Sequence, residues 1–239
     1  MYRSLRRLPA LLAAPAPIIL SLAILSIATV AVASDEDEAH DASAHVLQAE
    51  LALHRQDYLE AAREYRMAAQ LSDSVDIARQ ATRIATSYGF NEDALESAKR
   101  WTELDTESNE ALFYRARLEL RADDIRAARR SYKSLIERTE SPGDDGLLSL
   151  IGVITEENAQ AADEIMRWLA KPYKDSAAAH YAVAVTALQA GDNAYARKRI
   201  EKAIELDPDW LKAKLLYGRV LLVEGDVDGS IDYVARLIG

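Results

Sequence analysis

The sequence predicts an all-α protein in which helical hairpins of similar length follow one another along the chain as a solenoid. Its 239 residues include only 9 Gly and 6 Pro, whereas the helix-favouring residues Ala, Leu, Glu and Arg are abundant. A fixed repeat period is typical of arrays in which each repeat is one supersecondary unit. Small residues recur at spacings of 33, 34, 34, 34 and 34, at Ala61, Ala94, Ala128, Ala162, Ala196 and Ser230.

Residues 1–33 differ from the rest and are predicted to be a signal peptide or a membrane anchor. Arg3, Arg6 and Arg7 precede an apolar stretch at 18–33, which ends in the small residues that signal peptidase prefers. The apolar run from Leu8 to Ala33 is also long enough to remain in a bilayer. In either case we expect the rest of the chain to be periplasmic or held at the cell envelope, with membrane contact only through this segment.

Residues 34–43 form an acidic stretch that we interpret as a solvated spacer. Its carboxylates and histidine are possible ligands for a divalent cation, but the sequence provides no rigid frame for them. The formal net charge of −10 argues against broad binding of nucleic acids or anionic membranes. Cysteine is absent, so disulfides, thiolate metal sites and thiol nucleophiles are excluded.

Residues 42–239 are predicted to form six repeats of two helices each. Side chains that can pack follow each small residue by four and seven positions, as Tyr65 and Ala68 follow Ala61, so that all three lie on one helical face. A second small residue usually lies twelve positions earlier, where two helices approach closely. Leu150 is the exception, and its bulk is expected to splay the fourth pair. The predicted repeats are 42–74, 75–108, 109–142, 143–176, 177–210 and 211–239.

In its period, and in the stretch IELDPDW at 204–210, this region resembles the tetratricopeptide repeat family. The resemblance implies a right-handed superhelix in which the first helix of each pair lines a concave side. It also implies protein or peptide partners. A finer resemblance covers 49–105 and 178–192, which are similar to periplasmic repeat lipoproteins that present cell-wall hydrolases to carboxy-terminal processing proteases in Gram-negative bacteria. Those proteins carry a lipid-bearing Cys that is absent here.

Helical geometry selects the side chains that would point to the concave side. The first half is expected to be cationic and aromatic, which suits a carboxylate-bearing peptide, and the second half apolar. Alternatively, the arginines are solvated or pair nearby, for example with Glu119 or Asp124, and the aliphatic residues belong to the core. The three tryptophans, Trp101, Trp168 and Trp210, are interpreted as packing residues. The predicted partner-binding residues are Arg79, Arg83, Phe113, Tyr114, Arg117, Arg121, Leu147, Ile151, Tyr181, Val185 and Arg219.

No catalytic centre, metal site or cofactor is predicted. The four His are scattered, and no HExxH, GxSxG or glycine-rich phosphate loop occurs. The printed sequence ends directly after the predicted second helix of the sixth repeat. Self-association, a docked partner or a longer natural chain would each cover the apolar end face that this leaves.

These observations favour a non-catalytic scaffold that binds partner proteins in the bacterial cell envelope. The finer resemblance extends this function to the presentation of cell-wall hydrolases to a processing protease. The alternative is an assembly factor for pilus, secretin or exopolysaccharide export machinery. An enzyme appended to the array is disfavoured, because the six repeats leave no residues for a catalytic domain.

Overall fold

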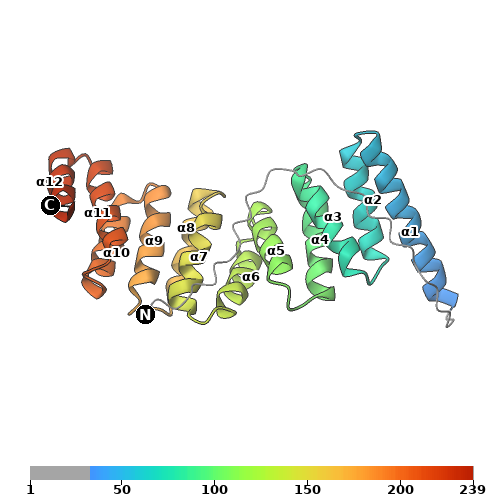
Figure 1. The fold of residues 1–239 in the computed structure, drawn as a ribbon, viewed down its shortest axis with the longest axis horizontal. Helices are drawn as coiled ribbons and strands as arrows, with labels where there is room; N and C mark the ends of the chain where they lie inside the picture. Colours follow the sequence, from blue (N-terminus) through green and yellow to red (C-terminus); the bar gives the residue numbers. More distant parts are fainter. Residues whose placement is uncertain (1–32, 239) are drawn as a thin grey trace.

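The computed structural model describes residues 33–238, with side chains from 40 to 237, and this part of the chain confirms the all-α fold (Figure 1). It contains twelve α-helices, one π-helical turn and no β-strand within the described range. The α-helices are α1 (Ala33–His54), α2 (Tyr58–Gln70), α3 (Val75–Ser87), α4 (Asn91–Leu104), α5 (Asn109–Arg121), α6 (Ile125–Glu137), α7 (Leu147–Ile154), α8 (Ala159–Ala170), α9 (Ala177–Gln189), α10 (Asn193–Leu206), α11 (Leu211–Val223) and α12 (Val227–Ile238).

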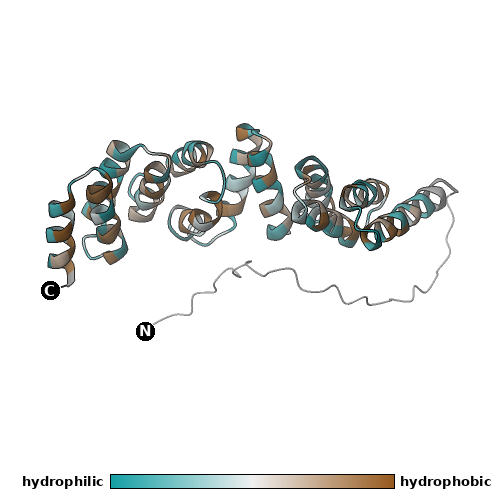
Figure 2. Cartoon of the chain, turned by 90° about the horizontal axis from the view of Figure 1, so that it is seen from above, coloured by the Kyte–Doolittle hydropathy of each residue, from teal (hydrophilic) through white to brown (hydrophobic). Residues whose placement is uncertain are grey.

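The helices pair in chain order into six hairpins, which stand side by side in a row from α1 to α12 (Figure 1). First helices also touch first helices, as α7 touches α9, and second helices touch second helices, as α6 touches α8. The array therefore has two layers, which we name the first-helix face (α3, α5, α7, α9, α11) and the second-helix face (α2, α4, α6, α8, α10). Viewed from above, individual helices carry both hydrophobic and hydrophilic residues (Figure 2).

The predicted signal peptide or anchor at 1–33 lies outside the described residues except for Ala33. Helix α1 begins at Ala33 and therefore includes the stretch at 34–43 that the sequence suggested as a spacer. This stretch contains no Gly or Pro, so nothing in it ends a helix. No helix in the described part of the chain is long and apolar enough to cross a bilayer.

Most turns inside the hairpins share one backbone conformation. The residue two positions before the second helix has a positive φ in five of the six hairpins, at Gln56, Gly89, Asp123, Gly191 and Gly225. Side-chain oxygens then cap several of the following helices, as Asp124 accepts from the Ala127 N–H at 2.9 Å. In the fourth hairpin the equivalent position is Glu157, whose φ is not positive.

The fourth hairpin also begins differently. Its first helix is short, and the π-helical turn Pro142–Gly146 precedes it, so that the five residues of the turn and the eight of α7 together match the 13 of α3. A Cβ on Gly143 would lie 2.6 Å from Tyr173 Cδ1, so only Gly fits there. Leu150 is buried, and α7 packs more closely against α9 than against its own partner α8, as the bulk of Leu150 led us to expect.

The core follows the period of small residues. Ala61, Ala94, Ala128 and Ala196 are completely buried, and in the last hairpin Ser230 donates to the Gly218 carbonyl at 2.8 Å. Removing these side chains and their neighbours from water is the main driving force for stacking. Neighbouring repeats are also joined by ion pairs between residues 25 to 27 positions apart, which we name the inter-hairpin ion pairs. They are Arg66–Asp93 (2.7 Å), Arg83–Glu110 (2.6 Å), Arg100–Asp73 (2.6 Å), Arg167–Asp192 (2.8 Å) and Arg197–Glu224 (2.8 Å).

Candidate partner-binding site

The structure places every predicted partner-binding residue on the first-helix face. Helix α3 carries two of them, α5 four, α7 two, α9 two and α11 one. Helix α9 contacts both α7 and α11, the ion pair Arg83–Glu110 links α3 to α5, and Arg117 links α5 to the turn after α7, so these residues form one strip along the array. Its two halves differ in what they leave available to a partner.

The arginines of the N-terminal half already have carboxylate partners. Arg79 pairs with Asp76 within α3, and Arg83 reaches Glu110 of α5 at 2.6 Å. Arg117 lies 2.9 Å from Glu156 and also pairs with Glu157. The chain itself therefore provides carboxylates for these arginines, which agrees with the alternative that they pair nearby.

Glu157 is the centre of this neutralisation. Its side chain is only 8% exposed, and it receives hydrogen bonds from Arg117 and, at 2.9 Å, from Arg121. Burial alone would raise the pKa of the Glu157 carboxyl, but the hydrogen bonds from Arg121 and Arg117 outweigh it and hold this pKa below its usual value. The carboxylate comes from the turn between α7 and α8, at the position where other hairpins have a positive φ. Glu119, suggested by the sequence as a partner for these arginines, instead binds Arg115 at 2.8 Å.

The aromatic residues of the N-terminal half form a packed cluster. The ring of Tyr114 lies 5.9 Å from that of Trp101 and 6.2 Å from that of Phe113. Trp101 is 2% exposed, as expected of a packing residue. Burial raises the pKa of the Tyr114 phenol, and the neighbouring Arg83 opposes the shift. Phe113 and Tyr114 remain half-buried, so this cluster offers aromatic edges at the surface.

In the fourth hairpin the predicted binding residues belong largely to the core. Leu147 is completely buried, so its assignment to a partner-binding surface is wrong. The cause is the π-helical turn, which fits an extra residue into one turn and so rotates the following residues relative to an α-helical register. Ile151 is half-buried and packs on the same core cluster.

The C-terminal half of the strip, on α9 and α11, is apolar and carries unpaired cations. Tyr181 and Val185 are half-buried, and the Tyr181 ring lies 4.7 Å from that of Trp210. Burial raises the pKa of the Tyr181 phenol, and the charge of Arg219 partly offsets this effect. Arg219 itself is exposed and has no ion pair among the side chains described.

Helix α11 adds exposed apolar residues to the predicted binding residues. Leu211 is 51% exposed, Leu215 43% and Leu222 51%. Positions 211, 215, 219 and 222 share one side of a helix, so these leucines flank Arg219. The spacing was visible in the sequence, but it does not reveal which apolar residues remain uncovered. Helix α11 contains no Asp or Glu, and its three cations make no ion pair within the described part of the chain.

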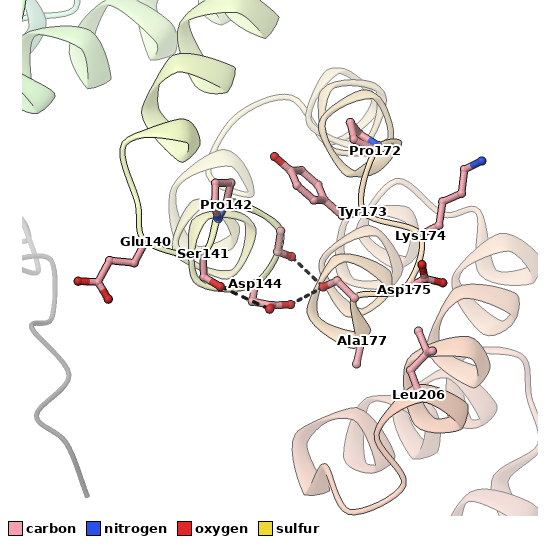
Figure 3. A pocket seen from close by; sticks show the side chains of 12 residues that line it. Glu140, Ser141, Pro142, Asp144, Pro172, Tyr173, Lys174, Asp175, Ala177 and Leu206 are labelled. Carbon is pink, nitrogen blue, oxygen red and sulfur yellow. Dashed lines mark hydrogen bonds between the residues drawn. The ribbon is translucent and has the colours of Figure 1, made fainter.

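A shallow depression of about 610 Å³ lies away from this strip, where the π-helical turn meets the start of α9 (Figure 3). Ser176 donates to the Gly143 carbonyl at 2.9 Å and also bonds Asp144, which closes one side of it. Glu140, Asp144 and Asp175 give it an acidic lining. In the range with described side chains, no group of three or more His, Asp or Glu is placed to hold a metal ion.

Comparison with known protein families supports the predicted repeats in the C-terminal region. Residues 181–239 match the tetratricopeptide repeat family, whose members are generally non-catalytic interaction scaffolds. No curated protein sequence matches the chain. The match spans the fifth and sixth hairpins, from Tyr181 in α9 onward. It therefore includes α11 with its exposed leucines and Arg219.

Solved structures of similar fold are distant. MamA from Desulfovibrio magneticus RS-1 is 15% identical over 70% of this chain and 94% of its own, with a TM-score of 0.39. YrrB, described as a TPR protein with an unusual peptide-binding site, is 16% identical over 75% and 93%, with a TM-score of 0.38. PilW, described as a widely conserved type IV pilus biogenesis factor, is 15% identical over 82% and 91%, with a TM-score of 0.40.

Proposed function

We propose that this chain is a non-catalytic scaffold that holds a segment of a partner protein on its first-helix face, at α9 and α11. The observation that carries the proposal is the exposed surface of α11, where Leu215 and Leu222 flank the unpaired Arg219. Exposed apolar surface next to an available cation suits a segment with apolar side chains and a carboxylate. In the N-terminal half, by contrast, each predicted arginine already has a carboxylate.

The proposal includes a place and a pathway for this scaffold. The arginines and apolar run within residues 1–33 support export to the periplasm or attachment to the envelope. The finer resemblance supports the presentation of cell-wall hydrolases to a processing protease. Assembly of pilus, secretin or exopolysaccharide export machinery is the alternative, since it needs the same kind of non-catalytic surface.

Affinity capture from envelope extract, with partners identified by mass spectrometry, tests the proposal. The full chain is compared with the double variant Leu215→Ser, Arg219→Gln and with Arg79→Gln as a matched control. We expect the double variant to lose partners that the control retains. A protease recovered with hydrolases supports the adaptor pathway, and pilus or secretin subunits support assembly. Equal recovery by all three proteins contradicts a site on α11.

A further inference from the structure

The second-helix face contains a group of cations that the chain does not neutralise. Several arginines elsewhere on this face are paired, as in Arg66–Asp93 and Arg167–Asp192, whereas Arg63 of α2 and Arg199 of α10 are each the one arginine of their helix without an ion pair in the described region. Helix α6 is different, because its exposed Arg126 and Arg130 make no ion pair or hydrogen bond with any described residue. The helix carries four cations in one stripe and a single acid, Glu137.

An exposed tryptophan lies beside this stripe. Trp168 of α8 is 39% exposed, so its interpretation as a packing residue is wrong. The guanidinium of Arg129 lies 5.7 Å from the centre of its ring, and Arg129 also pairs with Glu164 at 2.7 Å. The Arg129 Nε–H is buried without a hydrogen-bond partner. These contacts join α6 to α8 and still leave Trp168 partly exposed.

Tryptophan and arginine are the side chains most enriched where proteins bind one another strongly. An exposed indole leaves apolar surface in water, and a guanidinium can bind a carboxylate with two hydrogen bonds. The surface around Trp168, Arg126, Arg129 and Arg130 therefore offers an apolar anchor next to available cations.

We propose that this surface, named here the α6–α8 patch, is a second docking site, and that its occupant is an acidic segment of a partner protein with at least one apolar side chain. The net charge of −10 favours this occupant, because a nucleic acid or an anionic membrane would meet repulsion around the patch, whereas a short segment meets only the patch itself. The α6–α8 patch and α11 lie in different layers. One molecule can thus hold two partners at once.

Fluorescence anisotropy with a short labelled peptide of alternating aspartate and leucine tests the proposal. The full chain is compared with Arg126→Gln, Arg130→Gln and with Trp168→Ala. Arg63→Gln is the matched control, since Arg63 is exposed on α2 of the same face and has no ion pair. We expect each patch variant to bind about tenfold more weakly, and the control to bind as the unaltered chain does.

A peptide with asparagine in place of aspartate separates charge from apolar contact, and we expect it to bind poorly to every variant. Circular dichroism melts check that the variants fold, which the exposure of the substituted side chains leads us to expect. Equal peptide affinity for the patch variants and the unaltered chain overturns the proposal. So does patch-dependent binding of a DNA duplex or of anionic phospholipid vesicles, or self-association that the patch variants abolish, because each assigns the surface to another occupant.

Discussion

The two halves of the first-helix face have the same architecture but leave different chemistry at the surface. On α3 and α5 the arginines are held by carboxylates, Arg79 by one on its own helix and Arg117 and Arg121 by Glu157 of the next repeat. On α11 there are no carboxylates, and Arg219 remains unpaired among exposed leucines. The difference shows that the residues of a helix do not by themselves determine what a repeat offers to a partner. The turn of the next hairpin decides whether its charges are available.

The largest effect is expected from removing the carboxylate that neutralises arginines in the N-terminal half. Glu157→Ala removes the buried acceptor of Arg117 and Arg121, and we expect it to lower the free energy of unfolding by about 2 kcal/mol. Urea unfolding followed by circular dichroism measures the loss. Glu156→Ala is the control, since this side chain is 47% exposed and its removal should cost less than about 0.5 kcal/mol. Equal losses for the two variants would show that Glu157 has no special part.

Next in size is an effect on the unpaired half. Leu215→Ser together with Arg219→Gln should weaken binding of the captured partner about tenfold, because an apolar contact and a charge-assisted hydrogen bond are both lost. Isothermal titration calorimetry on the purified pair provides the measurement. Since Leu215 and Arg219 are exposed, the unfolding midpoint should stay nearly constant. A large fall in that midpoint would mean that the surface is structural.

Acid should affect the two halves in different pH ranges. His180 of α9 is buried, its Nε2 bonds the Lys174 carbonyl at 2.8 Å, and its Nδ1 has no partner. Burial lowers the pKa of His180 below 6.5, so the unfolded chain takes up its proton first and stability falls as the pH drops below about 6.5. The pKa of Glu157 is also lowered, so its contribution is lost only below about pH 4.5.

Thermal melts across this pH range should therefore show two separate losses. His180→Gln removes the first and Glu157→Gln reduces the second. If the stability of His180→Gln fell between pH 7 and pH 5 as much as that of the unaltered chain, another group would be responsible for the loss.

The smallest effect is expected at Arg79. This side chain is 41% exposed, and its only ion-pair partner in the described region, Asp76, lies on the same helix and is 79% exposed. Arg79→Ala should change the free energy of unfolding by less than about 0.5 kcal/mol and leave partner affinity unaltered. A measurable loss of affinity would restore α3 to the binding surface.

The fold was predictable because it depends on a local pattern. Small residues such as Ala61 and Ala94 recur where helices cross, and capping residues such as Asp124 begin the next helix. The π-helical turn was not predictable. The sequence SPGDDG at 141–146 indicates that the preceding helix ends, but not which kind of helix begins there. Leu147 was misplaced for this reason.

The site was less predictable than the fold. The sequence placed Arg117 and Arg121 on the correct face, but their partner Glu157 is 36 to 40 residues away. Pairing over that distance depends on how the fourth hairpin docks on the third, which periodicity does not specify. The exposure of Trp168 had a signal in the repeat register. Trp101 lies seven residues after the small residue Ala94 and is buried, whereas Trp168 lies six after Ala162, next to the buried Leu169.

The inter-hairpin ion pairs have a mechanical consequence. Each joins consecutive repeats, whereas the apolar contacts of the core also hold each hairpin together internally. Dissolved salt screens partly exposed ion pairs and leaves hydrophobic burial intact. The array should therefore bend and stretch more readily in concentrated salt while each hairpin stays folded, so that its stiffness follows the ionic composition of its surroundings.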